Sequence, residues 1–241
     1  MAEAAIAFSP ELAFFLRPGR RSAPVTVTCD GVSTLGHVVE SLGVPLTEVG
    51  ALTVNGKLTG SARHLGAGDV ARVAPVLRPQ RVSEPRFLLD VHLGTVARRL
   101  RLVGVDAAYH RDADDPALVQ QANDERRVLL TQDRGLLMRR ALWCGAFVRG
   151  SRPDEQFADV LDRFTPPLAP WTRCGACNGR LAPVAKADIE RRLMPGTRRS
   201  YDSFAQCQSC GRVYWRGAHS PRLAALIGEA ARIVAARGTG H

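Results

Sequence analysis

The sequence predicts an α/β protein with a β-grasp domain at its N-terminus, a parallel α/β/α domain in the middle and a small metal-binding ribbon after it. Three observations lead to this prediction. The first part of the chain shows the order strand, strand, helix, strand, strand, and the middle part alternates short apolar strands with amphipathic helices. The third observation is a set of two C-x-x-C pairs near the C-terminus.

The N-terminal domain is predicted over residues 1–78. Its helix is expected within residues 30–45, where Ser33 is a candidate N-cap and apolar residues recur on one face. Asn55-Gly56 is typical of the tight turn of a β-hairpin. The predicted strands lie in residues 4–9, 24–29, 51–60 and 64–76.

The middle domain is predicted over residues 86–165, after a polar linker with two prolines at residues 77–86. Alternating strands and helices at this spacing imply a parallel sheet with helices on both faces. The predicted strands are 87–89, 105–109, 128–130 and 146–148, and the predicted helices are 93–103, 116–123, 136–143 and 154–164.

The composition is that of a globular protein, with 45% hydrophobic side chains among 241 residues. No apolar run approaches the roughly 20 residues that a membrane helix needs. The N-terminal segment contains acidic residues and lacks the basic start of a signal peptide. We therefore expect a soluble, cytoplasmic protein that has no membrane partner.

Several aspartates are expected to meet at one edge of the predicted parallel sheet, where the carboxyl ends of the strands face a crevice. Asp90 directly follows the apolar run FLL, and Asp133 follows VLLTQ. The run Asp112-Ala113-Asp114-Asp115 lies directly before the middle helix and can bring a third carboxylate to the same edge. Converging acids repel one another unless a hard cation such as Mg²⁺ or Mn²⁺ lies among them. Such a site can activate a water and offset charge on a phosphodiester.

Each of these aspartates also has a purely structural interpretation. Asp115 precedes Pro116 and suits a helix N-cap, and Asp133 or Thr131 could cap the next helix. Asp90 could simply begin a helix after its strand. Taken alone, each residue leaves both interpretations open, whereas the three acids together, in β/α order, favour a shared metal site.

The middle and C-terminal parts resemble the PIN-like nucleases and, more closely, the Mut-7 C-terminal RNase family. The resemblance covers most of residues 86–220 and rests on FLLDVHLGTVARRLRLVGVDAAYHRDADDPALVQQA, RRVLLTQDR, RCGACNGRLAPV and YDSFAQCQSCGRVYWRGAH. It implies a PIN-like RNase domain in which Asp90, Asp115 and Asp133 are catalytic and hold Mg²⁺ or Mn²⁺, with Asp112 and Asp114 as alternatives to Asp115. A fourth acidic ligand is not assigned. The predicted function is metal-dependent hydrolysis of RNA, and the alternative is a non-catalytic RNA-binding or adaptor protein.

The N-terminal domain is similar to the ubiquitin-like, sulfur-carrier type of β-grasp domain that often precedes this RNase domain. The segments LGVPLTEV and TVNG and the spacing of the elements carry this resemblance. Sulfur carriers end in a free Gly-Gly tail, but this chain continues through APVLRPQ into the linker. We therefore expect a binding or positioning module, which could recruit a protein partner.

Four of the six cysteines form the pattern C-x2-C-x29-C-x2-C. Four thiolates at two tight turns match a tetrahedral structural Zn²⁺ and leave no open position for catalysis. The long spacing predicts an inserted helix or loop, and LAPVAKADIERRL is the candidate for a helix. A redox pair is the alternative to zinc for the cysteines. The zinc ribbon is predicted over residues 170–220, followed by a helix or tail at 221–241. The proposed zinc ligands are Cys174, Cys177, Cys207 and Cys210.

The net charge of +10 is concentrated in the last third of the chain, because residues 166–241 contain 12 basic and 4 acidic side chains. Most of these basic side chains are arginines, whose planar guanidinium group matches the geometry of phosphate oxygens. This distribution predicts RNA as a partner, although a solvated basic surface is the plainer interpretation. The candidate nucleic-acid contacts are Arg98, Arg101, Arg134, Arg212 and Arg216.

Overall fold

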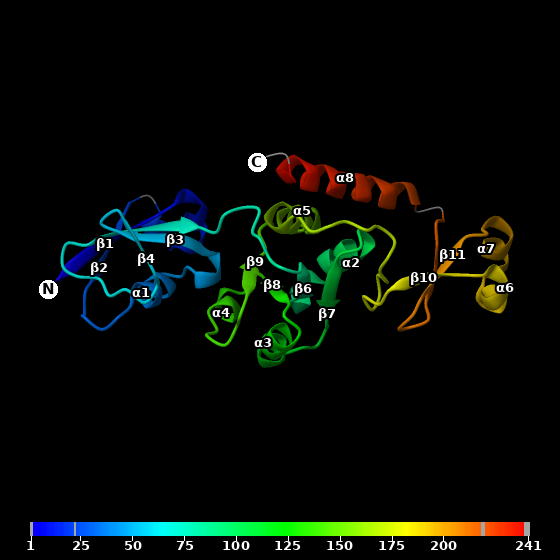
Figure 1. Ribbon diagram of the computed structural model, residues 1–241, viewed down its shortest axis with the longest axis horizontal. Helices are drawn as coiled ribbons and strands as arrows, with labels where there is room; N and C mark the ends of the chain where they lie inside the picture. The colour runs from blue at the N-terminus through cyan, green and yellow to red at the C-terminus, as the bar shows by residue number, and fades with distance from the viewer. Residues whose placement is uncertain (1, 22, 218–219, 239–241) are drawn as a thin grey trace. The chain divides into compact units, whose positions relative to one another are not determined.

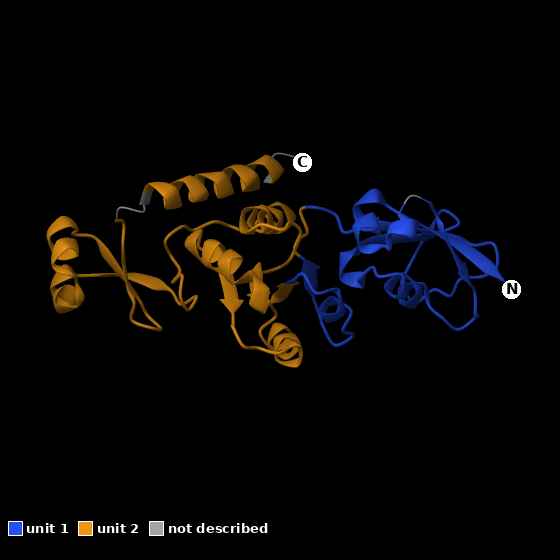
Figure 2. Ribbon diagram, turned by 180° about the vertical axis from the view of Figure 1, so that it is seen from behind, with its two compact units in different colours: residues 1–78, 131–147 blue, residues 79–130, 148–241 orange. Residues whose placement is uncertain are grey.

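The structure, a computed structural model, describes residues 2–21, 23–217 and 220–238 (Figure 1). The chain forms two compact units: unit 1 contains residues 1–78 and 131–147, and unit 2 contains residues 79–130 and 148–241 (Figure 2). Each unit is described by itself. Among the described residues, no helix is both long and apolar enough to cross a membrane.

Unit 1 is built on a five-stranded mixed sheet with the order β2-β1-β5-β3-β4. The two central strands β1 and β5 run parallel, and the other pairs run antiparallel, which confirms the predicted β-grasp domain. The strands are β1 (Glu3–Phe8), β2 (Val25–Thr28), β3 (Val49–Val54), β4 (Lys57–Thr59) and β5 (Val70–Pro75). The helices are α1 (Leu35–Ser41) and the 3-10 helices η1 (Pro10–Phe15), η2 (Pro18–Arg20) and η3 (Leu46–Glu48).

Local signals explain where these elements begin and end, with one correction. Helix α1 is capped by Thr34, whose hydroxyl accepts a hydrogen bond from the N–H of His37 at 3.2 Å. The predicted cap Ser33 is wrong, because its hydroxyl donates instead to Asp30 at 2.6 Å. The predicted Asn55-Gly56 turn is confirmed: both residues have positive φ, 51° and 78°, as a type I′ hairpin requires.

The core of unit 1 includes side chains from the segment 131–147, which holds α4 (Arg134–Leu137) and β9 (Gly145–Phe147). Leu137 and Phe147 are buried in this core, and Leu142 packs against it. The predicted helix over 136–143 is wrong, because α4 ends at Leu137. Residues five apart on a helix point roughly 140° away from each other, so the chain must turn for both Leu137 and Leu142 to reach one core.

The sheet of the middle region has the order β7-β6-β8-β9, and the boundary between the two units falls within β8. Strand β6 runs parallel to both β7 and β8, which confirms the predicted parallel sheet. Helices α2 and α5 lie over one face of β6 and β7, and α3 lies over the other (Figure 1). The elements are β6 (Arg86–Leu89), η4 (Val91–Leu93), α2 (Gly94–Leu102), β7 (Asp106–Tyr109), α3 (Asp115–Asp124), β8 (Val128–Thr131) and α5 (Pro153–Phe164).

The central strands of this sheet are covered on both faces. Phe87, Leu88 and Leu129 are 0% exposed, as expected for continuous apolar strands between two helix layers. The preceding linker is partly ordered, because the N–H of Gln80 donates to the carbonyl of Arg163 in α5 and the Arg163 guanidinium donates to the Gln80 side chain at 2.8 Å.

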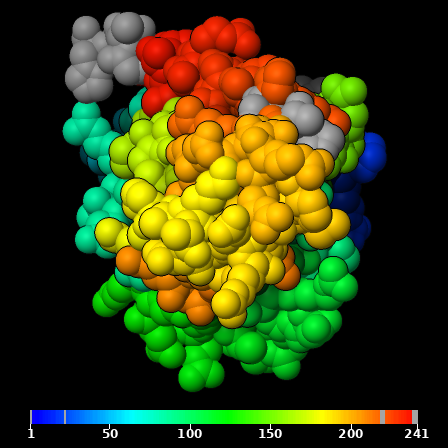
Figure 3. Space-filling model, turned by 90° about the vertical axis from the view of Figure 1, so that its right-hand side faces the viewer, coloured from blue at the N-terminus to red at the C-terminus, as the bar shows by residue number. Residues whose placement is uncertain are grey.

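The C-terminal part of unit 2 is a three-stranded antiparallel ribbon with the order β10-β11-β12. Figure 3 looks onto this part, where the surface is coloured yellow to orange. LAPV forms a strand rather than the predicted start of a helix, and the helical insert begins at Lys186. The elements are β10 (Leu181–Val184), α6 (Lys186–Ile189), η5 (Glu190–Arg192), α7 (Pro195–Ser200), β11 (Phe204–Cys207), β12 (Val213–Trp215) and α8 (Ser220–Gly238), which packs on α5.

Candidate functional site

The four predicted zinc ligands come together at the base of the ribbon. Cys174 and Cys177 lie before β10, Cys207 ends β11, and Cys210 lies in the turn before β12. Their four sulfur atoms lie within 4.8 Å of one another, with 3.7 Å between Cys174 and Cys210 and 3.5 Å between Cys177 and Cys207. Thiolates around one Zn²⁺ at about 2.3 Å lie roughly 3.8 Å apart. The cluster is therefore compatible with a zinc site.

Hydrogen bonds favour the thiolate form of Cys174. Burial opposes its ionisation, but bonds from the Tyr214 hydroxyl, at 2.9 Å, and from the N–H groups of Cys177 and Ala176 outweigh burial and lower its pKa to about 6. A ligand that is ionised near neutral pH suits a metal, since the thiolate is the coordinating form. Tyr214 thus acts on the cysteine cluster from β12.

The first cysteine turn is joined to the sheet of unit 2 by Arg101, which is 3% exposed. Its Nε donates to the carbonyl of Ala107 at 2.7 Å, and its Nη1 donates to the carbonyls of Gly175 and Ala176 at 3.2 and 3.0 Å. The guanidinium is therefore occupied inside the protein. We withdraw Arg101 from the candidate RNA contacts, because it joins the ribbon to the end of α2.

A second junction is centred on Asp106, at the start of β7. Its carboxylate pairs with Arg127 and with Arg173 at 3.0 Å, and it accepts a hydrogen bond from Asn178 at 2.8 Å. Sequence reasoning did not single out any of these residues. The sequence contained one signal for this junction: Asp106 begins an apolar strand, and a carboxylate is seldom buried there unless it is paired.

The charge network around Asp106 predicts an acid-sensitive ribbon junction. Burial disfavours the carboxylate, but the hydrogen bonds from Arg127 and Asn178 and the nearby arginines outweigh it and lower the pKa of Asp106. The stabilisation is therefore complete above the unfolded-state pKa of about 4 and is lost as the pH falls through the folded-state value. We expect Asp106→Asn to cost about 3 kcal/mol at pH 7, because two arginines lose a partly buried counter-charge.

This expectation is measured by urea denaturation of the wild type and Asp106→Asn at pH 7 and at about pH 2, well below the unfolded-state pKa. The difference in unfolding free energy between them should shrink at the lower pH. Asp202→Asn is the matched control, because Asp202 pairs with Lys186 while its side chain is 91% exposed, and it should change little. A difference that does not depend on pH would show that the charge of Asp106 is unimportant.

Asp90 lies at the carboxyl end of β6 and is only 6% exposed. Its N–H donates to the carbonyl of Leu130 at 3.0 Å, and its own carbonyl accepts from Leu93 at 2.9 Å, so its backbone is fixed between β8 and η4. Asp90 occupies the N-cap position of η4, but its side chain makes no capping hydrogen bond there. Capping therefore does not explain this buried carboxylate.

The middle group of acids lies at the start of α3. Asp114 is the N-cap: its side chain accepts from the N–H of Ala117 at 2.9 Å. Asp115 is the first helical residue, followed by Pro116, so the capping role considered for Asp115 belongs to its neighbour. Asp112 and Asp114 are exposed and Asp115 is half-buried. A capping role is thus shown for Asp114.

Asp133 caps α4 in unit 1. Its Oδ1 accepts from the N–H groups of Gly135 and Leu136 at 2.7 and 3.3 Å, and its own N–H donates to the hydroxyl of Thr131 at 2.9 Å. Both capping bonds use one carboxylate oxygen. The capping interpretation of Asp133 is therefore correct, but capping uses only one of the two carboxylate oxygens.

The described structure contains one group of side chains close enough to hold a metal ion. Among the described histidines, cysteines, aspartates and glutamates, only the four ribbon cysteines have at least three ligand atoms within 4.8 Å of one another. Asp90, Asp115 and Asp133 do not form such a group, so a metal site made by them stays a prediction.

The remaining predicted RNA contacts differ in their surroundings. Arg98 on α2 and Arg212 and Arg216 on the ribbon are exposed, and the guanidinium of Arg216 lies 5.4 Å from the ring centre of Trp171. Arg134 is half-buried, and its guanidinium donates to the carbonyls of Phe15 and Phe14 at 2.8 and 3.2 Å. Arg98, Arg212 and Arg216 therefore stay candidates for binding phosphate, whereas Arg134 is bound within unit 1.

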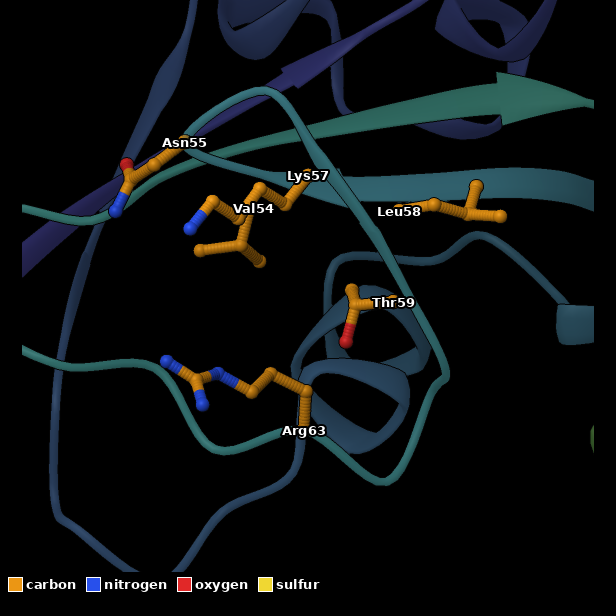
Figure 4. Close-up of a pocket in the computed structure, with 6 residues that line it drawn as sticks. All are labelled: Val54, Asn55, Lys57, Leu58, Thr59 and Arg63. Carbon is orange, nitrogen blue, oxygen red and sulfur yellow. The ribbon is translucent and has the colours of Figure 1, made fainter.

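The β-grasp domain carries a hollow of about 390 Å³ beside the β3–β4 hairpin (Figure 4). Lys57 and Arg63 lie on opposite sides of it, and no acidic residue lines it. Asn55, at its edge, stabilises the hairpin through hydrogen bonds with Asp69 and the N–H of Val70. None of the predicted acids lines this hollow, so it does not belong to the predicted acidic site.

The fold and the cysteine cluster define an α/β domain built on a parallel sheet, with a ribbon compatible with zinc, preceded by a β-grasp domain. Residues 85–227 match the Mut7-C RNAse domain family and residues 1–81 match the Mut7-C ubiquitin family. The chain therefore belongs to the Mut7-C RNAse domain family. No curated protein gives a significant match. Small archaeal modifier protein 1 of H. volcanii is 21% identical over 32% of this chain and 100% of its own, with a TM-score of 0.26.

Proposed function

We propose that this protein hydrolyses phosphodiester bonds of RNA at a Mg²⁺ or Mn²⁺ site held by Asp90, Asp115 and Asp133. The parallel pairing of β6 with β7 and β8 supports this proposal most strongly. Leu89 is in register with Tyr109 and Leu130, so the three strands end at the same edge of the sheet. Asp90 follows β6 directly, and the chain reaches Asp133 three residues after Leu130.

Carboxylate oxygens are the donors that these hard cations prefer, so the acids suit Mg²⁺ or Mn²⁺ better than the thiolates do. When bound there, the ion would supply an activated water and offset the charge that develops on the phosphate. Asp90 provides a carboxylate on a fixed backbone at the strand end, and Asp133 provides the oxygen that capping leaves unused. Asp115 is preferred as the middle ligand, because it is half-buried at the start of α3, whereas Asp112 and Asp114 are exposed.

RNA would be held mainly by exposed arginines of unit 2. Arg98, Arg212 and Arg216 are accessible, and residues 166–241 carry most of the net positive charge. Contacts of this kind bind phosphate without reading sequence. The family match supports RNA as the substrate class, and the ubiquitin-like domain supports protein interactions, although neither a particular RNA nor a protein partner is specified.

A second candidate function is RNA binding without cleavage. It is favoured by one observation: Asp114 and Asp133 both cap helices, a role that needs no metal. Under this alternative the arginines would still bind RNA, but the acids would contribute only to stability.

Cleavage of one labelled single-stranded RNA, with Mn²⁺, with Mg²⁺ and with EDTA, separates the two functions. We expect cleavage that requires the divalent ion and exceeds cleavage of a DNA strand of the same sequence. Asp115→Asn should slow it by roughly 10²-fold, the size of effect seen when one electrostatic group at a reacting centre is removed. Asp114→Asn is the matched control, because asparagine caps a helix as well as aspartate does. Binding of RNA without cleavage would establish the alternative instead.

A further inference from the structure

The side chain of Arg134 lies against the 3-10 helix η1 of the β-grasp domain. Besides its hydrogen bonds to the carbonyls of Phe14 and Phe15, its guanidinium carbon lies 5.1 Å from the centre of each phenylalanine ring. Charged donors on carbonyl oxygens form the stronger class of hydrogen bond, and a cation over a ring face adds to them. We call this set of interactions the Arg134 contact.

The other end of the same segment is held by the β-grasp domain as well. The N–H of Phe147 donates to Oε1 of Glu48 at 2.8 Å, and Glu48 is only 2% exposed. The ring of Phe147 packs on the rings of Phe14 and Phe15, with centres 5.4 and 5.1 Å apart. The β-grasp domain thus contacts segment 131–147 at its beginning and at its end.

The position of Arg134 gives the contact a consequence for Asp133. Arg134 is the first residue of α4, a helix of only four residues, and a helix this short is not stable by itself. The N–H groups of Gly135 and Leu136, in the first turn of this helix, orient the Asp133 carboxylate. Whatever holds the first turn of α4 therefore holds the carboxylate of Asp133.

We propose that Arg134 is a positioning residue through which the β-grasp domain orients the metal-binding carboxylate of Asp133. This inference rests on the proposed function and extends it: the ubiquitin-like domain is a working part of the nuclease and not only a surface for partners. Arg134 then contributes to metal affinity and turnover without touching RNA.

The test compares full-length wild type with Arg134→Gln and Arg134→Lys in the absence and presence of Mn²⁺. Without Mn²⁺, we expect the amides of Gly135 and Leu136 to exchange hydrogen about tenfold faster in Arg134→Gln, the change that loss of one charge-assisted hydrogen bond produces. Calorimetric titration should show a similar, roughly tenfold rise in the Mn²⁺ dissociation constant. Arg134→Lys, which keeps the charge but loses the planar fork, should lie in between.

Arg140→Gln is the matched control. It removes the same charge from the same segment, at an exposed position where the structure shows no hydrogen bond or ion pair. We expect it to leave amide exchange and Mn²⁺ affinity unchanged. Should Arg134→Gln fail to fold, Phe14→Leu serves in its place, because it removes one ring from a half-exposed position and keeps the carbonyl acceptor.

Two results would overturn the inference. One is unchanged exchange at Gly135 and Leu136 in Arg134→Gln. The other is a combination of two findings for Arg134→Gln: unchanged Mn²⁺ affinity, and weaker RNA binding that is less sensitive to salt by about one released counterion. That combination is the behaviour of a phosphate contact. If the wild type neither binds Mn²⁺ nor cleaves RNA, the proposed function fails, whereas the exchange measurement still decides whether Arg134 holds the turn.

Discussion

Replacement of Asp133 by asparagine is expected to slow RNA cleavage by about 10³-fold while leaving the protein folded. A metal ion contributes several kcal/mol of transition-state stabilisation, and about 4 kcal/mol corresponds to 10³ in rate. Asparagine is as good an N-cap as aspartate, so the bonds from Gly135 and Leu136 can persist in the variant. The substitution therefore removes the anionic ligand and keeps the helix start.

Single-turnover cleavage at saturating Mn²⁺ measures this effect, and circular dichroism with thermal melting checks the fold. Asp30→Asn is a closely matched control, because the carboxylate of Asp30 also accepts bonds from backbone N–H groups, those of Val32 and Ser33, in an exposed turn. Asp90→Asn should resemble Asp133→Asn in its effect on the rate. Equal rates for wild type and Asp133→Asn would remove Asp133 from the site.

Removal of zinc is expected to unfold the ribbon. Structural zinc contributes apparent free energies of about 10–16 kcal/mol in small zinc-binding peptides. We expect the ribbon to rely on a metal in the same way, because it is small: its three strands have three or four residues each, and only Phe204 and Cys207 among them are buried. We expect one zinc per chain in the purified protein. A strong chelator should abolish hydrogen-exchange protection in β10, β11 and β12.

Cys207→Ser should lower the zinc content and loosen the ribbon, because it removes a buried ligand. Cys29→Ser is the control: Cys29 lies in the β-grasp domain, apart from the four-sulfur cluster, and its thiol donates a hydrogen bond to the carbonyl of Gly66, which a serine hydroxyl can also donate. It should keep one zinc per chain. Purified wild-type protein that contains no metal, holds two disulfides and keeps full protection of the ribbon would instead support the redox alternative.

The parts of the fold that were predictable from sequence are those whose signals are local. The turn residues Asn55 and Gly56 need positive φ, and the apolar strand 87–89 needs covering on both faces. The two C-x-x-C pairs likewise contain all four proposed zinc ligands. The residue at which a helix begins was less predictable. Ser33 and Thr34 are neighbours that can cap a helix equally well, and so are Asp114 and Asp115.

What was not predictable depends on contacts between residues far apart in the chain. In the sequence, Arg101 and Arg134 look like exposed basic residues. Their hydrogen-bond partners lie more than seventy residues away, at Ala176 for Arg101 and at Phe15 for Arg134. Asp106 is conspicuous only once Arg173 and Asn178 are beside it. That Asp90, Asp115 and Asp133 converge on one ion stays a prediction from strand order.

The make-up of unit 1 has a consequence for how the chain folds as it is synthesised. Domains generally fold from the N-terminus as they emerge from the ribosome. Here the β-grasp sheet is complete at Pro75, but Leu137 and Phe147 join its core only later in translation. Until then the nascent chain exposes part of an apolar surface, including the rings of Phe14 and Phe15, to which Phe147 binds. A chaperone that engages the nascent chain in this interval would prevent its aggregation.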